Sequence, residues 1–424
     1  MTDIFALVDC NSFYVSCERI FRPDLNKKPV GVLSNNDGCI VALSKELKNL
    51  GIKRGTPAFR ISHLIKKHHI TLFSSNYTLY GDISARIMNV LSMFTPDLEI
   101  YSIDEAFLSF KGMEHFDLEK YAKEIKDIVW KWVGVPVSIG IGETKTLAKI
   151  ANHIAKKYDK FGGIFNLVNH PQKKLVLSYV KVSDIWGIGN KYAEKLNRFG
   201  ILNASQFIDC DEDFIEKEMT IVGLKTLKEL KGVSCIVLDD YVKSKKQIIS
   251  SKSFGKPISD FDDLMQAISS YLEIALEKLR KQHSVAGQMM IFLTTNPFKN
   301  SSQYANYVSA SLEIPSAYSP GFIQIGRRLL KSIYKEGYQY KKVGVMISDI
   351  QKEEEAELDF FKTAYIDDKH KNIMDVFDKI NRINGRNTIF YSSSGTDKKW
   401  AMRREFLSKR YTTNWKELPI VKAE

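Results

Sequence analysis

The sequence is short of cysteine and has no long apolar run, and both features exclude protein classes. The cysteines are scattered and form no Cys-x-x-Cys pair, which argues against a disulfide framework and against structural zinc. No apolar stretch reaches the roughly 18 to 20 residues of a membrane-spanning helix. The opening Met-Thr-Asp-Ile-Phe has neither the basic flank nor the cleavage site of a secretory signal. We therefore expect a cytoplasmic protein that does not bind a membrane.

Acidic residues are also in deficit. Lysine plus arginine number 62 and aspartate plus glutamate 50, so the net charge is +12 over 424 residues. A basic excess of this kind favours a polyanionic partner, nucleic acid before an acidic membrane surface. At roughly 150 residues per domain, the length predicts two to four domains.

The first 165 residues alternate predicted strands and helices, which is typical of an α+β layer. The apolar run Ile4–Val8 predicts a strand, and Asp9 follows it directly. A helix is predicted from about Ile40 to Leu50. Strand-like Leu98–Ile103 leads into Asp104 and Glu105. Acids therefore stand at the ends of two predicted strands.

The rest of the chain changes character twice. Residues 166–240 are mainly helical around Trp186-Gly-Ile-Gly189, and residues 243–256 carry five lysines without an acid, which indicates a basic linker or arm. Residues 257–350 alternate again, with helices predicted near 261–281 and 319–335. A ββα-type module is therefore expected after the arm.

The acids Asp9, Asp104 and Glu105 are the first candidate site. Mg²⁺ prefers oxygen ligands, and two such ions about 3.5 to 4 Å apart would support nucleotidyl transfer by activating the attacking hydroxyl and stabilising the leaving pyrophosphate. From spacing alone, helix caps or turn residues are an equally good interpretation. Neighbours on a regular strand point to opposite faces, so Asp104 and Glu105 can share a metal site only if the chain bends there.

Two acidic motifs resemble the signatures of Y-family translesion DNA polymerases: Val8-Asp-Cys-Asn-Ser-Phe-Tyr14 and Tyr101-Ser-Ile-Asp-Glu-Ala-Phe107. Four further segments are similar to the UmuC branch of that family, which supplies the catalytic subunit of a bacterial SOS polymerase. They are Leu33-Ser-Asn-Asn-Asp-Gly-Cys39, Phe73-Ser-Ser-Asn-Tyr77, Trp186-Gly-Ile-Gly189 and Arg410-Tyr-Thr-Thr413. The resemblance covers essentially the whole chain, in order.

The resemblance implies a site for two Mg²⁺ ions. It assigns Asp9, Asp104, Glu105 and the main-chain carbonyl of Cys10 as metal ligands, with the three acids as the catalytic residues. It makes Tyr14, beside Phe13, the steric gate, a ring that leaves no room for the 2′-hydroxyl of a ribonucleotide. An ordinary core aromatic is the alternative for Tyr14.

The resemblance also implies contacts for the incoming dNTP and for primer-template DNA. Lys48 and Lys156 match triphosphate contacts, while Ala42 and Lys45 stand where other members carry a hydroxyl residue and a tyrosine, so Lys45 is a weak further candidate. Gly187 and Gly189 suit a helix-hairpin-helix, whose backbone N–H groups approach a phosphate; a plain helical turn is the alternative. The arm lysines suit backbone contacts: Lys243, Lys245, Lys246 and Lys252.

A glycine pair and an acidic segment complete the sequence signals. Gly140-Ile-Gly142 lacks the remaining features of a dinucleotide fingerprint or a P-loop, and more plausibly turns a strand into a helix that projects lysines. Leu358, Phe360 and Phe361 resemble a sliding-clamp peptide, with Glu357 where that peptide has glutamine. The C-terminal region implies a UmuD′-type accessory dimer and a RecA filament as partners.

We therefore expect a multidomain α+β right hand that carries out low-fidelity, template-directed translesion synthesis in the SOS response, associated with the nucleoid. The expected domains are a palm at 1–10 and 77–165, fingers at 11–76, a helix-hairpin-helix thumb at 166–240, a little finger at 241–350 and a partner-binding region at 351–424. A catalytically silent DNA-binding subunit is the alternative, although all three acids are present. A phosphotransferase with Asp9 as nucleophile is disfavoured, because Asn11 stands where its second aspartate belongs.

Overall fold

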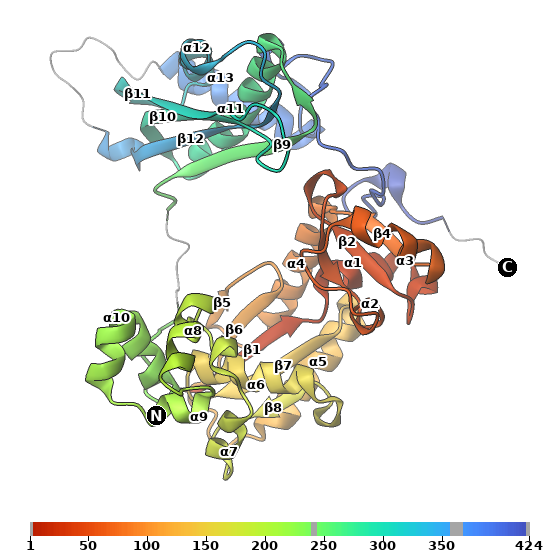
Figure 1. Ribbon diagram of the computed structural model, residues 1–424, viewed down its shortest axis with the longest axis vertical. Coiled ribbons are helices and arrows are strands. Elements are labelled where there is room, and N and C mark those ends of the chain that lie inside the picture. Colours follow the sequence, from red (N-terminus) through yellow and green to blue (C-terminus); the bar gives the residue numbers. More distant parts are fainter. Residues whose placement is uncertain (1–2, 239–243, 357–367, 421–424) are drawn as a thin grey trace. The chain divides into compact units, whose positions relative to one another are not determined.

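The computed structural model describes residues 3–238, 244–356 and 368–420 (Figure 1). The chain divides into two compact units, one comprising Met1–Ser34, Gly38–Val242 and Phe406–Glu424, the other Asn35–Asp37 and Lys243–Glu405. No helix in the described part is long and apolar enough to cross a membrane.

The first unit is built on a mixed sheet with the strand order β5-β6-β1-β7-β8. Its strands are β1 (Phe5–Cys10), β5 (Leu98–Ile100), β6 (Glu105–Ser109), β7 (Val137–Gly142) and β8 (Ile164–Asn166). Strand β1 runs antiparallel to both β6 and β7, and β7 pairs parallel with β8. The central strand β1 thus ends at Asp9 and Cys10 in the middle of the sheet.

Helices cover both faces of this sheet. The residues of β1 alternate: Ile4, Ala6 and Val8 belong to a core shared with α4 (Tyr77–Leu91) and α5 (Leu118–Val133). Phe5 and Leu7 pack on the other face, against Ala148 of α6 (Lys145–Lys157). Because strand side chains alternate with a period of two, Asp9 points to the α6 face, as Phe5 and Leu7 do.

A smaller sheet and two helical groups complete the first unit. The small sheet has the order β3-β2-β4, with β2 (Val30–Leu33), β3 (Ile40–Leu43) and β4 (Thr71–Ser74), and it lies with α1 (Phe13–Phe21), α2 (Lys45–Asn49) and α3 (Ser62–Lys67). Four helices follow the large sheet: α7 (Lys173–Ser178), α8 (Asn190–Arg198), α9 (Ala204–Ile208) and α10 (Glu212–Leu230).

The continuous helix predicted from Ile40 to Leu50 is wrong. Residues Ile40–Leu43 form strand β3, which pairs with β2. Ser44 then caps α2, because its side chain accepts a hydrogen bond from Leu47 N. The β-branched residues at the start favour a strand, and a periodic apolar pattern does not show where a strand gives way to a short helix.

The second unit is an antiparallel sheet packed on helices. Its strand order is β11-β10-β12-β9, with β9 (Ile248–Ile258), β10 (Ser284–Thr295), β11 (Ala305–Ser316) and β12 (Tyr340–Lys352). Helices α11 (Phe261–Lys281) and α12 (Ser319–Ile333) share a core with the sheet, and α13 (Asp368–Asn384) follows. The helix predicted near 261–281 is α11.

Strand β9 corrects the interpretation of residues 243–256 as a linker or arm. Ile248, Phe254 and Ile258 are buried in the core of the second unit. Because buried and exposed positions alternate along a strand, lysines can occupy the more exposed positions of β9 while its apolar residues enter the core.

Short 3₁₀ helices connect several elements: Pro23–Leu25, Asn35–Asp37, Ala58–Ile61, Asp159–Phe161, Val182–Asp184, Glu353–Glu355, Ser392–Ser394 and Trp415–Glu417.

Candidate active site

Two of the three predicted acids lie opposite each other on adjacent strands of the sheet. Asp9 on β1 is in register with Glu105, the first residue of β6. Directly opposed residues in an antiparallel pair have Cβ atoms about 5 Å apart on one face. Their carboxyl groups share a hydrogen bond. Strand pairing therefore brings together two acids that the sequence separates widely.

Asp104 lies in a bend just before β6, which is the break that a shared site requires. Its carbonyl oxygen accepts a hydrogen bond from Cys10 N at 2.9 Å, so the bend is joined to the end of β1. Its side chain accepts a hydrogen bond from the Ser102 hydroxyl at 2.7 Å. All three acids line one cavity.

Helix α6 brings two lysines to the acids. Thr144 caps the helix by accepting a hydrogen bond from Leu147 N. Lys149 Nζ lies 2.8 Å from Glu105 Oε2, and Lys156 forms an ion pair with Asp9. Positions 149 and 156 are two helical turns apart and share a helix face, so one surface of α6 supplies both cations.

The glycines of β7 let α6 approach the sheet closely. A Cβ atom on Gly140 would lie 2.0 Å from Asn152 N and 2.4 Å from Ala148 O, both backbone atoms of α6. The strand-to-helix role predicted for Gly140 and Gly142 agrees with this packing. Lys145 differs from the prediction that it projects from the helix: it is buried, paired with Glu99, and donates to Val237 O.

The charges of the acidic pair are interdependent. Burial, and secondarily Glu105, raise the pKa of Asp9 to about 7 against the opposing effect of Lys156. Burial alone would raise the pKa of Glu105 as well, but its hydrogen bond with Asp9 and the ammonium of Lys149 lower it. Two carboxyl groups in contact cannot both ionise freely, so the pKa of Asp9 is raised while that of Glu105 is lowered.

The donor set fits a hard divalent cation. In residues 3–238, 244–356 and 368–420, no three Asp, Glu, His or Cys side chains are grouped closely enough to hold a metal ion. The acids nevertheless offer only oxygen ligands, which Mg²⁺ prefers. Asp9 and Glu105 are in contact, and a divalent cation bound between carboxylates would relieve the repulsion between them.

The cavity has a volume of about 1000 Å³ and is lined by both acidic and basic side chains. Lys48 and Lys156, both predicted, line it together with Lys53 and Arg54. Burial lowers the pKa of Lys48, and the nearby charges of Arg54 and Lys156 lower it further. Crowded cations of this kind suit an anionic ligand such as a triphosphate.

Sequence reasoning missed Lys53 and Arg54, which follow Gly51 in a loop that carries no motif. It also gave no site role to Lys149, although the spacing from Lys149 to Lys156 was a usable signal. Lys149 Nζ lies 4.3 Å from the centre of the Tyr101 ring and 5.3 Å from that of Trp186. Lys45 does not line the cavity; it pairs with Asp159 at 2.8 Å.

Tyr14 lines the cavity, and so does the buried Phe13. The Tyr14 ring stacks on Tyr80 with centroids 4.5 Å apart and planes 16° apart. Tyr77 meets it edge-on at 6.1 Å. Tyr14 therefore has aromatic packing behind it while bordering the space in front of the acids.

The glycines of the predicted helix-hairpin-helix are exposed. Gly187 has φ +89°, in the left-handed region that favours glycine, and Gly189 precedes α8 with open space around its α-carbon. Both glycines are exposed, as phosphate binding by backbone N–H groups requires. DNA binding here stays a prediction.

Of the predicted arm lysines, Lys245 and Lys246 are exposed, and Lys252 is half-buried within β9. Burial lowers the pKa of Lys252, and the cations Arg404, Arg386, Lys398 and Lys278 lower it further. A basic cluster therefore exists in the second unit. Lys243 and the clamp-peptide residues Leu358, Phe360 and Phe361 lie outside the described residues.

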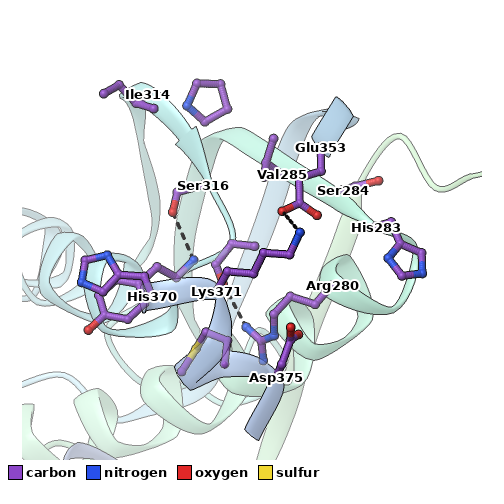
Figure 2. A pocket seen from close by; sticks show the side chains of 14 residues that line it. Arg280, His283, Ser284, Val285, Ile314, Ser316, Glu353, His370, Lys371 and Asp375 are labelled. Atoms are coloured by element: carbon purple, nitrogen blue, oxygen red, sulfur yellow. Dashed lines mark hydrogen bonds and ion pairs between the residues drawn. The ribbon is translucent and has the colours of Figure 1, made fainter. Parts of the chain in front are cut away.

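The second unit contains a separate cavity of about 520 Å³ (Figure 2). It lies between the end of α11, the start of β10, the end of β11 and the start of α13. Figure 2 shows Lys371 reaching Glu353, an ion pair of 2.8 Å. Arg280 is held by both carboxyl oxygens of Asp378. Two cations that line this cavity, Lys371 and Arg280, are therefore already neutralised by carboxylates.

Comparison with protein families gives three matches along the chain. The impB/mucB/samB family matches residues 8–153, and the C-terminal domain of that family matches residues 245–360. A domain of unknown function, DUF4113, matches residues 371–421.

Several named proteins are similar over most of their length. Protein UmuC of Salmonella typhimurium is 39% identical over 99% of this chain and 100% of its own. Protein MucB of Escherichia coli is 37% identical over 98% of this chain and 99% of its own. DNA polymerase IV 1 of Bacillus subtilis is 24% identical over 90% of this chain and 91% of its own.

Solved structures share the fold. A Y-family DNA polymerase chimera superposes with a TM-score of 0.65 at 20% identity, over 82% of this chain and 99% of that chain. The insertion ternary complex of Dbh DNA polymerase superposes with a TM-score of 0.55 at 19% identity, with the same coverage.

Proposed function

The chain belongs to the impB/mucB/samB family, the UmuC-type branch of the Y-family DNA polymerases, and we propose that Asp9, Asp104 and Glu105 are its catalytic acids. It is a DNA-directed DNA polymerase that carries out translesion synthesis. The predicted α+β right hand is confirmed by the likeness to Y-family structures.

The observation that carries the site assignment is one cavity lined by the three acids and by several cations. Asp9, Asp104 and Glu105 line it together with Lys48, Lys53 and Arg54, and Lys156 is paired with Asp9. A polymerase has to hold a dNTP triphosphate and a metal-bound primer end in one place. One cavity lined by both hard oxygen donors and cations meets both requirements.

Catalysis in this family depends on divalent metal, and we assign two Mg²⁺ ions to the acids and to the Cys10 carbonyl. When bound there, the ions supply Lewis acidity for the primer hydroxyl and for the leaving pyrophosphate. Lys48, Lys156 and Arg54 orient the triphosphate through charge. Tyr14, supported by Tyr80, excludes the 2′-hydroxyl of a ribonucleotide.

Primer extension tests the acids. With Mg²⁺, the parent protein should extend a primer on an undamaged template and on a template with an abasic site, and Asp104→Asn should lose extension by at least about a hundredfold. Asp97→Asn is the matched control, because Asp97 is exposed and lies just before β5. If Asp104→Asn extended primers as well as the parent, the metal assignment would be wrong.

The same assay addresses the alternative of a catalytically silent subunit. If the protein is a catalytically silent subunit, it should bind primer-template DNA and yet fail to extend the primer at any Mg²⁺ concentration. Extension that disappears with Asp104→Asn, while DNA binding persists, supports the polymerase.

For template binding we propose the exposed turn at Gly187 and Gly189 and the basic surface of the second unit. That surface includes the predicted lysines and the cations around Lys252, namely Lys278, Arg386, Lys398 and Arg404. Contacts of this kind grip the backbone without reading bases, which suits damaged templates. Lys398→Ala should weaken DNA binding equally on different sequences and reduce the salt dependence of affinity.

We propose that the chain acts in the SOS response at the nucleoid, with a UmuD′-type dimer, a RecA filament and a sliding clamp as partners. The support is the sequence resemblance of the C-terminal region and of the clamp-like peptide. Adding clamp should lengthen extension products, and Phe360→Ala with Phe361→Ala should abolish that gain without changing basal extension. Equal lengthening with the variant would exclude this peptide as the clamp contact.

A further inference from the structure

The last described part of the chain returns to the first unit as an ordered segment, Phe406–Thr413, here called the C-terminal tail. Phe406 N donates to Ser74 Oγ, and Ser74 N donates to Phe406 O, both at 3.0 Å. Leu407 forms a parallel bridge with Ser74 at the end of β4. Tyr411 stacks on Phe21 of α1, with centroids 4.4 Å apart and planes 14° apart. The tail is therefore packed against β4 and α1.

One tail residue, Ser408, joins two helices of the first unit. Its hydroxyl donates to Glu18 Oε1 of α1 at 2.9 Å. The amide of Asn76 donates to the Ser408 carbonyl at 3.1 Å and to its hydroxyl oxygen at 3.0 Å. Asn76 also caps α4 by accepting a hydrogen bond from Leu79 N. Ser408 is thus tied to α1 directly and to the start of α4 through its cap.

A buried contact chain leads from Ser408 to Tyr14. The Tyr80 hydroxyl donates to the same Glu18 Oε1, at 2.6 Å, and both residues are fully buried. The second oxygen of Glu18, Oε2, is buried and has no hydrogen-bond partner among the described residues. One oxygen therefore holds both hydroxyls, and the Tyr80 ring so fixed stacks on Tyr14.

We propose that the C-terminal tail positions the steric gate: through Ser408, Glu18 and Tyr80, it holds the Tyr14 ring where it excludes ribonucleotides. Nothing in the match to a domain of unknown function assigns this task to its C-terminal part. Ser408, Glu18 and Tyr80 are positioning residues, because they act on the sugar only through Tyr14. The proposal rests on the gate role of Tyr14 given under the proposed function.

The physical basis is that a gate selects by exclusion, so its selectivity depends on how rigidly the ring is held. The Tyr14 ring is packed by Tyr80 on its face and by Tyr77 on its edge, and both belong to α4. The tail contacts α4 at its cap, Asn76, and contacts α1, which carries Tyr14, at Glu18. Glu18 in turn accepts the hydrogen bond from Tyr80 of α4. Loss of the tail would leave a buried carboxylate with fewer donors and a freer Tyr80 ring.

The test is single-turnover incorporation of one ribonucleotide and of its deoxyribonucleotide counterpart. Ser408→Ala should raise the ratio of kcat/KM for the ribonucleotide to kcat/KM for the deoxyribonucleotide by about two- to tenfold, the effect of losing one hydrogen bond. Ser408→Thr keeps the hydroxyl and should restore the parent ratio. Truncation after Glu405 should raise the ratio at least as much as Ser408→Ala. Lys416→Ala is the matched control, because Lys416 is exposed and lies just beyond the tail.

A double-mutant cycle separates positioning from general destabilisation. Tyr14→Ala alone should raise the ratio, and Ser408→Ala should add nothing in that background, because residues that act through one group are not additive. A Ser408→Ala effect that persists in full without the Tyr14 ring would overturn the proposal. So would equal losses for both nucleotides, the signature of a purely structural role.

The two proposals fail in distinguishable ways. If Tyr14→Ala leaves the ratio unchanged, the gate assignment fails, and the tail proposal fails with it. If Tyr14→Ala raises the ratio while Ser408→Ala and the truncation leave it at the parent value, the gate stands and only the tail proposal fails. Should the truncated chain not fold, the Ser408 point variants still decide the question.

Discussion

Gly140→Ala should push helix α6 away from the sheet and thereby displace the lysines that contact the acids. The new Cβ would lie 2.0 Å from Asn152 N and 2.4 Å from Ala148 O. Both are backbone atoms, so no side chain can rotate away to make room. Overpacking of this kind costs about 3 kcal/mol. Asn152 also donates to Ser138 O at 2.7 Å, and losing that bond adds about 1 kcal/mol.

A loss of about 4 kcal/mol should lower the melting temperature of the first unit by about 8 to 16 °C. The measurement is differential scanning calorimetry, in which the second unit serves as an internal reference. Gly81→Ala is the matched control: nothing lies within 4 Å of its added Cβ, and alanine in the interior of α4 should stabilise by up to about 1 kcal/mol.

Gly140→Ala should also lower the rate of catalysis, because Lys149 and Lys156 are residues of α6. A displacement of about 1 Å at a catalytic site can cost about a hundredfold in rate. Primer extension by Gly140→Ala should therefore fall well below that of Gly81→Ala at a temperature where both are folded. An unchanged melting temperature together with unchanged extension would refute the close packing of α6 on β7.

The remaining predictions concern charge. Burial raises the pKa of Glu18 from 4.5 to about 7. The contribution of this residue to stability is therefore complete below about pH 4.5 and is lost as the pH rises to about 7, which lowers the free energy of unfolding by roughly 3 kcal/mol. Urea unfolding across this range should show that the free energy of unfolding falls as the pH rises, and Glu18→Gln should flatten this dependence. An equal pH dependence in the variant would contradict the assignment. Lys156→Ala should raise KM for dNTP about tenfold and Arg54→Ala by a similar factor, whereas Lys45→Ala, outside the cavity, should not change KM.

Much of the candidate site could be predicted from local sequence. Asp9, Asp104 and Glu105 each end or begin a strand pattern, and the motifs around them resemble one enzyme family. The need for a bend at Asp104 followed from strand geometry alone. The local pattern gave a wrong prediction at Ile40–Leu50, where one apolar run contains both a strand and a short helix. It also failed where lysines occupy the exposed positions of a real strand, at Ile248–Ile258.

Sequence therefore determined the chemistry of this protein: which acids stand at strand ends, which family they resemble, and that its partner is an anion. Only the tertiary structure decided which cations meet those acids, because Lys149 and Lys156 reach them from one face of α6 and Arg54 joins the same cavity from a loop. It alone placed Ser408 against Glu18, 390 residues away. Short-range patterns carry information about local conformation, whereas a contact across such a separation exists only once the chain has packed.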